Sequence, residues 1–373
     1  MRYKKLGNTD IEISVLGFGC MRFPMIKTDK GDDVDREKTY ALIRKAFCLG
    51  VNHFDTAYFY CGGHSENALG EALKGIRHRV YVSTKLPSSH IEKPGDARKL
   101  LEKQLEKLQT DYIDIYYFHG IGYESFLETN KKTEWLKDVQ KAKEEGLVRH
   151  ISFSFHDKPE NMKKLADMGC FESVLCQYSA IDRSNEEAMA YVKSKGMGVI
   201  VMGPMGGGRV SGMPKQVAER LGIKVKSSAE LALRFVLANP SVDCALSGMS
   251  TIQMVEENAQ VASNADPLSE QEVQAINEMM KENEKLAQLY CTGCSYCMPC
   301  PAEVNIPHIF QLMNYHRVYG ATQYAREGYS NIGSPWSPGK NADACIECGV
   351  CETKCPQKIK IREQLKESHA ALG

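Results

Sequence analysis

Blocks of apolar and polar positions alternate along residues 13–262, and they predict strands and helices in turn. Short runs rich in β-branched residues are typical of strands, and they lie at 13–19, 52–57, 80–85, 112–119, 148–154, 173–179, 198–204 and 242–248. Amphipathic stretches predict helices at 36–49, 65–74, 95–108, 134–145, 158–168, 185–195, 228–238 and 251–262. The strand runs are apolar throughout, as expected for parallel strands that are covered on both faces.

Regular alternation of strand and helix predicts an α/β fold, and eight repeats in about 250 residues favour a (β/α)8 TIM barrel. An open doubly wound sheet is the alternative. It would usually carry a G-x-G-x-x-G turn if it bound a dinucleotide, and the sequence has no such turn. The polar residues 1–12 predict a hairpin at the barrel floor, and 269–289 predict a charged helix.

Charge and composition narrow the choice of partners and compartment. The formal net charge is +0, so we expect neither a nucleic acid nor a membrane partner. The polar N-terminus and the lack of a long apolar run predict a cytoplasmic protein. Fourteen cysteines are many for such a protein, and in a reducing compartment they are typical of metal ligands rather than disulfides.

Eight of the cysteines form two tight groups in a tail whose composition differs from the rest. We therefore predict two domains, residues 1–285 and 286–373. The first group is Cys291, Cys294, Cys297 and Cys300, and the second is Cys345, Cys348, Cys351 and Cys355, each followed by proline. The second group has bacterial ferredoxin spacing, and the first is one residue shorter. Eight thiolates predict two [4Fe-4S] clusters; structural zinc is the alternative, although zinc sites usually use separated cysteine pairs.

The long linker between the cysteine groups predicts helices at 306–319 and 359–372. The tail therefore resembles a mostly helical dicluster ferredoxin rather than the compact βαββαβ form. This resemblance implies that the last cysteine of each group serves the other cluster. One cluster would lie on Cys291, Cys294, Cys297 and Cys355, and the other on Cys345, Cys348, Cys351 and Cys300.

Four titratable residues follow three successive predicted strands, where a barrel carries its catalytic groups. They are Asp55, Tyr60, Lys85 and His119. Reduction of a carbonyl requires a proton, which Tyr60 would supply as general acid, while the Lys85 ammonium would bring the pKa of the phenol toward neutrality. Asp55 would hold Lys85, and His119 would hydrogen-bond the carbonyl oxygen.

The run Asp55-Thr56-Ala57-Tyr58-Phe59-Tyr60, followed by Gly63, Glu66, Asn67 and Gly70, resembles the aldo-keto reductase signature. Lys85 and His119 complete that family's tetrad in order. The resemblance covers residues 1–285 and implies reduction of a small-molecule carbonyl by NADPH or NADH. It also implies a set of cofactor contacts: Gly19, Met21, Asp55, Ser154, Gln177, Met202, Gly203, Pro204, Met205, Gly206, Gly248, Ser250, Met254, Glu257 and Asn258.

Three departures from the family pattern bear on the cofactor. Phe155 stands where many members have asparagine, and Met202 stands where many stack an aromatic ring on the nicotinamide. The stretch 248–254 has no basic residue, whereas a 2′-phosphate is usually read by Arg or Lys. We therefore expect weak discrimination for NADPH, or a preference for NADH.

The role of the predicted clusters stays open at the level of sequence. A hydride carries two electrons and a cubane passes one, so the leading interpretation is carbonyl reduction by nicotinamide in the barrel. The alternatives are a relay from a ferredoxin or flavoprotein donor through the clusters, and a redox-sensing module without turnover. The intact tetrad argues against the sensing module.

Overall fold

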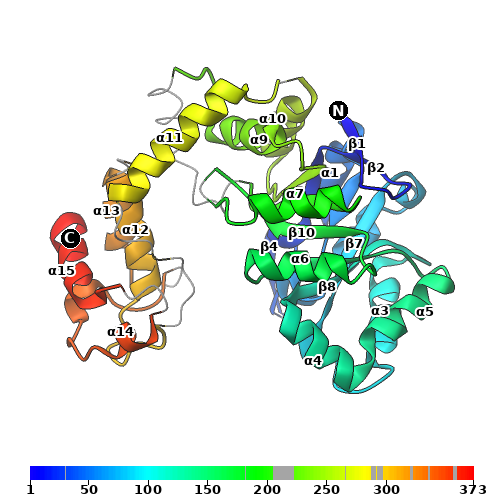
Figure 1. Ribbon diagram of the computed structural model, residues 1–373, viewed down its shortest axis with the longest axis horizontal. Coiled ribbons are helices and arrows are strands. Elements are labelled where there is room, and N and C mark those ends of the chain that lie inside the picture. The colour runs from blue at the N-terminus through cyan, green and yellow to red at the C-terminus, as the bar shows by residue number, and fades with distance from the viewer. Residues whose placement is uncertain are drawn as a thin grey trace. The chain divides into compact units, whose positions relative to one another are not determined.

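Eight strands in the described part of the chain close into a parallel barrel (Figure 1). The computed structural model describes residues 1–29, 31–180, 182–204, 222–264, 266–286, 291, 297–319, 322–334, 337–355 and 359–373. The barrel strands are β3 (Leu16–Gly19), β6 (His53–Asp55), β7 (Tyr81–Pro87), β8 (Ile113–Ile121), β9 (Val148–Phe155), β10 (Ser173–Gln177), β11 (Gly198–Met202) and β12 (Cys244–Ser247). Closure of the sheet confirms the predicted (β/α)8 barrel and excludes the open doubly wound alternative.

Amphipathic helices surround the barrel. They are α1 (Arg36–Cys48), α2 (Ser65–Ala72), α3 (Asp96–Leu108), α4 (Tyr123–Thr133), α5 (Trp135–Glu144), α6 (Pro159–Asp167), α7 (Glu186–Ser194), α9 (Ser228–Ala238) and α10 (Ile252–Asn264). In α3 the buried side chains recur at helical spacing, including Leu101, Leu105 and Leu108. Asp35 is the N-cap of helix α1, and its carboxylate accepts the Lys38 N–H at 3.0 Å.

Two elements near the N-terminus depart from the predicted pattern. The run predicted as one strand is split at Val15 into β2 (Glu12–Ser14) and β3, because β2 pairs with β1 (Tyr3–Lys5) in a hairpin and β3 enters the barrel. Leu6, Ile11 and Ile13 of this hairpin pack on inward-facing barrel residues in one apolar cluster. The predicted floor hairpin is therefore present. A second hairpin, β4 (Met25–Thr28) with β5 (Gly31–Val34), was not predicted.

The sequence also missed helix α4, which lies between β8 and α5. It packs through Phe126 into an aromatic cluster with Phe118, Trp135 and Phe171, whose ring centres lie 4.6 to 5.9 Å apart. Trp135 is fully buried there. Such tilted and edge-on pairs bury a large apolar area, so this cluster anchors α4 and α5 to the barrel wall.

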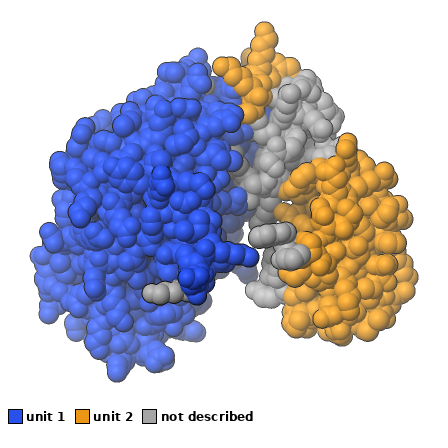
Figure 2. Space-filling view, turned by 180° about the vertical axis from the view of Figure 1, so that it is seen from behind, with its two compact units in different colours: residues 1–209, 229–269 blue, residues 210–228, 270–373 orange. Residues whose placement is uncertain are grey.

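The chain divides into two compact units, residues 1–209 with 229–269 and residues 210–228 with 270–373 (Figure 2). The second unit contains α11 (Glu270–Leu286), α12 (Ile306–Tyr319), α13 (Thr322–Ser330), α14 (Val350–Lys354) and α15 (Ile361–Leu372). The tail is helical, as predicted, and α11 groups with it; the boundary at residue 285 stays a prediction. Among the described helices, none combines the length and apolar character needed to cross a bilayer.

Candidate active site

The four predicted catalytic residues lie at the C-terminal ends of three adjacent strands. Asp55 ends β6, Lys85 lies two residues before the end of β7, and His119 lies two residues before the end of β8. Tyr60 opens the short 3-10 helix η2 (Tyr60–Gly63) that follows β6. This is the end of the barrel at which the fold carries catalytic groups.

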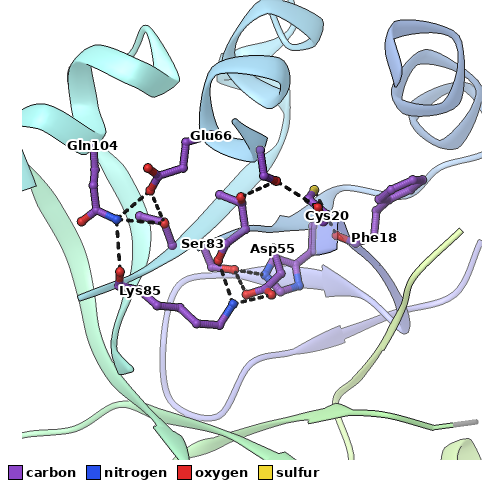
Figure 3. A network of polar contacts seen from close by, with 11 residues as sticks. Phe18, Cys20, Asp55, Glu66, Ser83, Lys85 and Gln104 are labelled. Carbon is purple, nitrogen blue, oxygen red and sulfur yellow. Dashed lines mark hydrogen bonds and ion pairs between the residues drawn. The ribbon is translucent and has the colours of Figure 1, made fainter. Parts of the chain in front are cut away.

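A buried ion pair forms the base of this site (Figure 3). Lys85 Nζ donates to Asp55 Oδ2 and to the Thr56 carbonyl, both at 2.7 Å, and the Lys85 and Asp55 side chains are 1% and 3% exposed. Burial acts to lower the pKa of Lys85, but Asp55 and Tyr60 outweigh it and the pKa is raised. The lysine is therefore a charged ammonium at neutral pH.

Tyr60 lies directly beside this ammonium. Lys85 Nζ is 4.6 Å from the centre of the Tyr60 ring. Burial nevertheless raises the pKa of Tyr60, and the ammonium offsets only part of the rise. The expected net shift toward neutrality is thus wrong, because burial disfavours the phenolate more than Lys85 favours it. The phenol stays protonated through the neutral range and is available as a proton donor.

His119 also lies beside Tyr60. The two ring centres are 6.3 Å apart, with planes at 83°. Burial, followed by the Lys85 ammonium, lowers the pKa of His119 to about 4. The imidazole is therefore neutral at physiological pH, so it can donate one N–H hydrogen bond but does not carry a charge.

The sequence reasoning missed a second imidazole at the same mouth. His156 follows the last residue of β9, and its backbone N–H donates to the Ile121 carbonyl at 3.3 Å. Burial and then the Lys85 ammonium lower the pKa of His156, and His156 in turn contributes to the lowered pKa of His119. Its position just after a barrel strand is the sequence signal that could have found it.

The predicted contacts for the nicotinamide half lie around this mouth. Gly19 pairs with Asp55 across β3 and β6, Met21 is exposed, and Ser154 is buried at the end of β9. Gln177 is exposed at the end of β10; Met202 is the last residue of β11, and Gly203 and Pro204 follow it. Gly203 has φ +65°, which favours glycine at this turn. Met205 and Gly206 lie outside the described residues.

The predicted contacts for the adenosine half lie around α10. Ser250, Met254 and Glu257 are exposed, whereas Asn258 is buried and its amide donates to Ser247 Oγ at 3.1 Å. A side chain on Gly248 would meet the aliphatic stem of Arg22 at 3.2 Å. Arg22 therefore brings a basic side chain to this loop, which the sequence reasoning missed because it considered residues 248–254 alone.

Six of the tail cysteines lie in one apolar cluster or pack against it. Cys297 and Cys351 are buried, Cys348 is exposed, and Cys294 lies outside the described residues. The remaining four predicted ligands pack against that cluster while partly buried: Cys291, Cys300, Cys345 and Cys355. Within the described ranges, no three His, Cys, Asp or Glu side chains converge closely enough to hold a single metal ion.

Backbone geometry in the second cysteine group favours an iron-sulfur site. Glu347 and Gly349 have φ values of +53° and +75°, and they flank Cys348. Left-handed residues within a turn can direct successive backbone N–H groups into one concavity, as at many iron-sulfur sites. The loop conformation therefore fits a cluster here, although no three of the described thiols converge on one point.

Residues 15–281, more than half of the chain, match the aldo/keto reductase family model. The chain belongs to the aldo/keto reductase family. Residues 290–359 match the 4Fe-4S dicluster domain. The predicted combination of an aldo/keto reductase barrel and a ferredoxin-type tail is thereby confirmed.

Similar proteins cover the barrel part of the chain. L-galactose dehydrogenase of Arabidopsis thaliana is 31% identical over 310 residues, which are 74% of this chain and 95% of that protein. The uncharacterized oxidoreductase YqkF of Bacillus subtilis is 28% identical over 315 residues, 76% of this chain and 98% of that protein. The holo form of aldo-keto reductase AKR11C1 from Bacillus halodurans is 28% identical with a TM-score of 0.64, covering 74% and 96%.

Two residues of the family signature have structural roles in this member. Glu66 Oε1 accepts from Thr84 at 2.7 Å and from Gln104 at 2.6 Å, and the Gln104 amide also donates to the Lys85 carbonyl at 3.1 Å (Figure 3). A side chain on Gly70 would lie 2.6 Å from the Leu108 backbone, so this glycine allows α2 and α3 to pack closely. Glu66 thus supports the strand that carries Lys85, and Gly70 supports the packing of the two helices beside it.

Proposed function

We propose that this chain is an NAD(P)H-dependent carbonyl reductase with Tyr60 as its proton donor and two [4Fe-4S] clusters in its tail. One observation carries the proposal. The Lys85 ammonium, fixed at 2.7 Å from both Asp55 and the Thr56 carbonyl, lies 4.6 Å from the Tyr60 ring that His119 also faces. A charged donor, a protonated phenol and a neutral imidazole thus share one barrel mouth.

Each of these groups has a distinct role in the proposed reaction. A bound reduced nicotinamide would supply the hydride to the carbonyl carbon. The neutral His119 would donate a hydrogen bond to the carbonyl oxygen, where negative charge develops. Tyr60 would transfer its proton to that oxygen, and the Lys85 ammonium would stabilise the resulting phenolate. Asp55 keeps the ammonium in place without itself exchanging a proton.

The mouth has groups suited to a nicotinamide dinucleotide. Gln177 exposes an amide at the end of β10, and Arg22 lies against Gly248 near the start of α10. Anionic phosphates are favoured at a helix N-terminus and beside arginine. The similarity to L-galactose dehydrogenase supports a dehydrogenase or reductase reaction in the same barrel. We keep the prediction of weak discrimination for NADPH, or a preference for NADH; a contact of Arg22 with a 2′-phosphate would reverse it.

Steady-state assays test the proposed reaction. The full-length chain should oxidise NADH or NADPH in the presence of members of an aldehyde and ketone panel, and Tyr60→Phe should lose that turnover while binding nucleotide normally. Full carbonyl reductase activity in Tyr60→Phe would refute the assignment of the acid. Assays of iron and acid-labile sulfide should give about eight of each per chain, as two [4Fe-4S] clusters require; bound zinc without sulfide would refute the clusters.

A second candidate is reduction driven by an external one-electron donor, a ferredoxin or flavoprotein. The exposed Cys348 favours it, because Ile346 and Val350 beside it are also exposed. This edge borders an open depression lined by Cys348, Gly349, Val350, Glu352, Thr353 and Arg362. Substrate reduction with reduced ferredoxin and without nicotinamide would favour this candidate over the first.

A further inference from the structure

A chain of fully buried polar side chains continues below the ion pair, toward the centre of the barrel. His53 lies two residues before Asp55 on β6, so both face the barrel interior, with His53 one layer deeper. Ser83 pairs with Asp55 across β6 and β7. Cys244 comes from β12, two strands away. The side chains of His53, Ser83 and Cys244 are inaccessible to solvent.

The direction of each hydrogen bond in this chain follows from valence. Ser83 Oγ lies 2.7 Å from Asp55 Oδ1, and an ionised carboxylate only accepts, so the single Ser83 hydroxyl hydrogen is donated there. His53 Nε2 lies 3.0 Å from the same Ser83 oxygen and must therefore be the donor. Nδ1 of His53 is then an acceptor, facing Cys244 Sγ at 3.7 Å. Every donor points toward Asp55.

The fold makes room for the imidazole at a specific glycine. Gly17 lies on β3, between the strands that carry His53 and Cys244. A Cβ at Gly17 would be 3.0 Å from both His53 Nδ1 and Cys244 Sγ, and 2.6 Å from a Leu246 methyl group. A side chain at this position would thus displace the imidazole.

The hydrogen bonds from Cys244 through His53 and Ser83 to Asp55 orient these side chains rather than conduct protons. Burial lowers the pKa of His53 to about 4, so its ring is neutral at physiological pH. The series of hydrogen bonds ends at Cys244, which lies in the apolar cluster of the barrel interior together with Leu175, Ile200 and Leu246. A buried thiol surrounded by apolar side chains offers no route to solvent.

We propose that Ser83 and His53 are positioning residues that hold Asp55, and through it Lys85, in the orientation that proton donation by Tyr60 requires. This inference rests on the proposed function. Ser83 holds Oδ1 of the carboxylate, which turns Oδ2 toward the ammonium. His53 holds the Ser83 hydroxyl, which would otherwise rotate about its Cβ–Oγ bond.

Kinetics of matched variants test the role of Ser83. Ser83→Ala should lower kcat about tenfold or more, because it removes a hydrogen bond to a buried charge, while the substrate KM and the nucleotide Kd change less than about twofold. Ser83→Thr keeps the hydroxyl and should restore most of the turnover. Ser152→Ala is the control, since Ser152 is equally buried but bonds Ser173 on β10. Equal kcat in Ser83→Ala and Ser152→Ala would overturn the proposal.

His53 should act only through Ser83. His53→Phe should lower kcat by a smaller factor than Ser83→Ala, and His53→Gln, which keeps a donor near the same position, should retain more turnover. In the Ser83→Ala background, His53→Phe should have no further effect on kcat, because residues in one hydrogen-bond chain are not additive. Additive losses in the double variant would contradict the chain.

Nitrogen NMR of labelled histidine tests the arrangement without any assay of activity. His53 should be protonated at Nε2 and not at Nδ1, and Asp55→Asn should shift its Nε2 resonance in the wild-type background but not in Ser83→Ala. Protonation at Nδ1, or indifference to Asp55→Asn, would overturn the inference even in an active enzyme. If the His53 resonance responds to Asp55→Asn as predicted but the protein reduces no carbonyl, the proposed function is refuted. The hydrogen bonds from His53 through Ser83 to Asp55 would still be supported.

Discussion

Both ends of the barrel carry ion pairs between a carboxylate and a cation, but the pairs have different roles at the floor and at the mouth. At the floor, Glu172 and Asp243 directly precede β10 and β12, and Asp114 lies near the start of β8. Each accepts a backbone N–H from a neighbouring strand and pairs with at least one cation. At the mouth, Asp55 also pairs with a cation, but Lys85 is 1% exposed and its remaining hydrogen bonds stay within the site.

The comparison shows that the setting of an ion pair determines its role. Among the floor cations, Lys143, Lys193 and Arg149 have side chains 31% to 49% exposed and Arg77 is 14% exposed, so water reaches all of them and they stabilise strand ends. The mouth cation is removed from water and faces Tyr60, so its charge acts on the ring that would carry the proton. We expect substitutions at the mouth to remove activity and those at the floor to reduce stability.

Tyr60→Phe should have the largest effect on activity. Loss of the general acid should lower kcat for carbonyl reduction by about 10²- to 10⁴-fold with little change in the unfolding free energy. Steady-state turnover and urea denaturation measure the two quantities. Unchanged turnover would remove the distinction between mouth and floor.

Lys85→Met should reduce both stability and activity, because it leaves the Asp55 carboxylate buried with Ser83 as its side-chain donor. Breaking a buried pair on one side costs about 3–5 kcal/mol. Asp55→Leu with Lys85→Met should recover much of the unfolding free energy and none of the turnover. If the double variant were as unstable as Lys85→Met alone, the buried charge would not be the cause.

Asp114→Asn should reduce stability without affecting catalysis. Its carboxylate accepts the Val82 N–H at 2.9 Å and pairs with Arg77 and Arg149 at 2.8 and 3.0 Å. Loss of the charge should lower the unfolding free energy by about 2 kcal/mol, as for hydrogen bonds to charged groups. Turnover of the folded variant should equal that of the wild type; a tenfold loss would show that the floor contributes to the chemistry.

The smallest effect should be a dependence of stability on pH at the floor. Burial acts to lower the pKa of His150, but Glu172 and Asp10 outweigh burial, so the pKa is raised. The stabilisation that His150 contributes is therefore fully present below the unfolded pKa of about 6.5 and is lost as pH rises through the folded pKa. Burial acts against Glu172, but hydrogen bonds from His150 and Lys143 lower its pKa to about 2. Its stabilisation is therefore lost as pH falls below about 4.5.

His150→Gln should remove the decrease in stability on the alkaline side, which we expect to be about 1 kcal/mol or less. Urea denaturation of wild type and variant between pH 5 and about pH 9 measures it. An identical alkaline slope in the two proteins would assign the effect to other groups.

The sequence predicted the elements that have a strong periodic pattern and missed those that do not. Helix α3 was found because its buried leucines recur every three or four residues. Helix α4 was missed because its only large buried side chain is Phe126. The hairpin of β4 and β5 is almost wholly exposed, so its residues carry no alternating pattern.

The same reasoning applies to the site. The tetrad could be predicted because its residues end predicted strands, and the fold dictates where strand ends meet. The contact of His53 with Ser83 depends on the register of β6 against β7, and the contact of Arg22 with Gly248 joins distant parts of the chain. Such contacts cannot be read from periodicity. The direction of the Tyr60 pKa shift also required the burial that only the structure provides.

The central claim is that a nicotinamide bound at the barrel mouth transfers hydride to a carbonyl and that Tyr60 supplies the proton. Its most direct test uses reduced nicotinamide that carries deuterium at the transferred position, with mass spectrometry of the alcohol formed by the full-length chain. The account predicts one carbon-bound deuterium per alcohol and almost no alcohol from Tyr60→Phe. Alcohol without deuterium, formed equally well by Tyr60→Phe, would contradict it and point to electrons delivered through the tail.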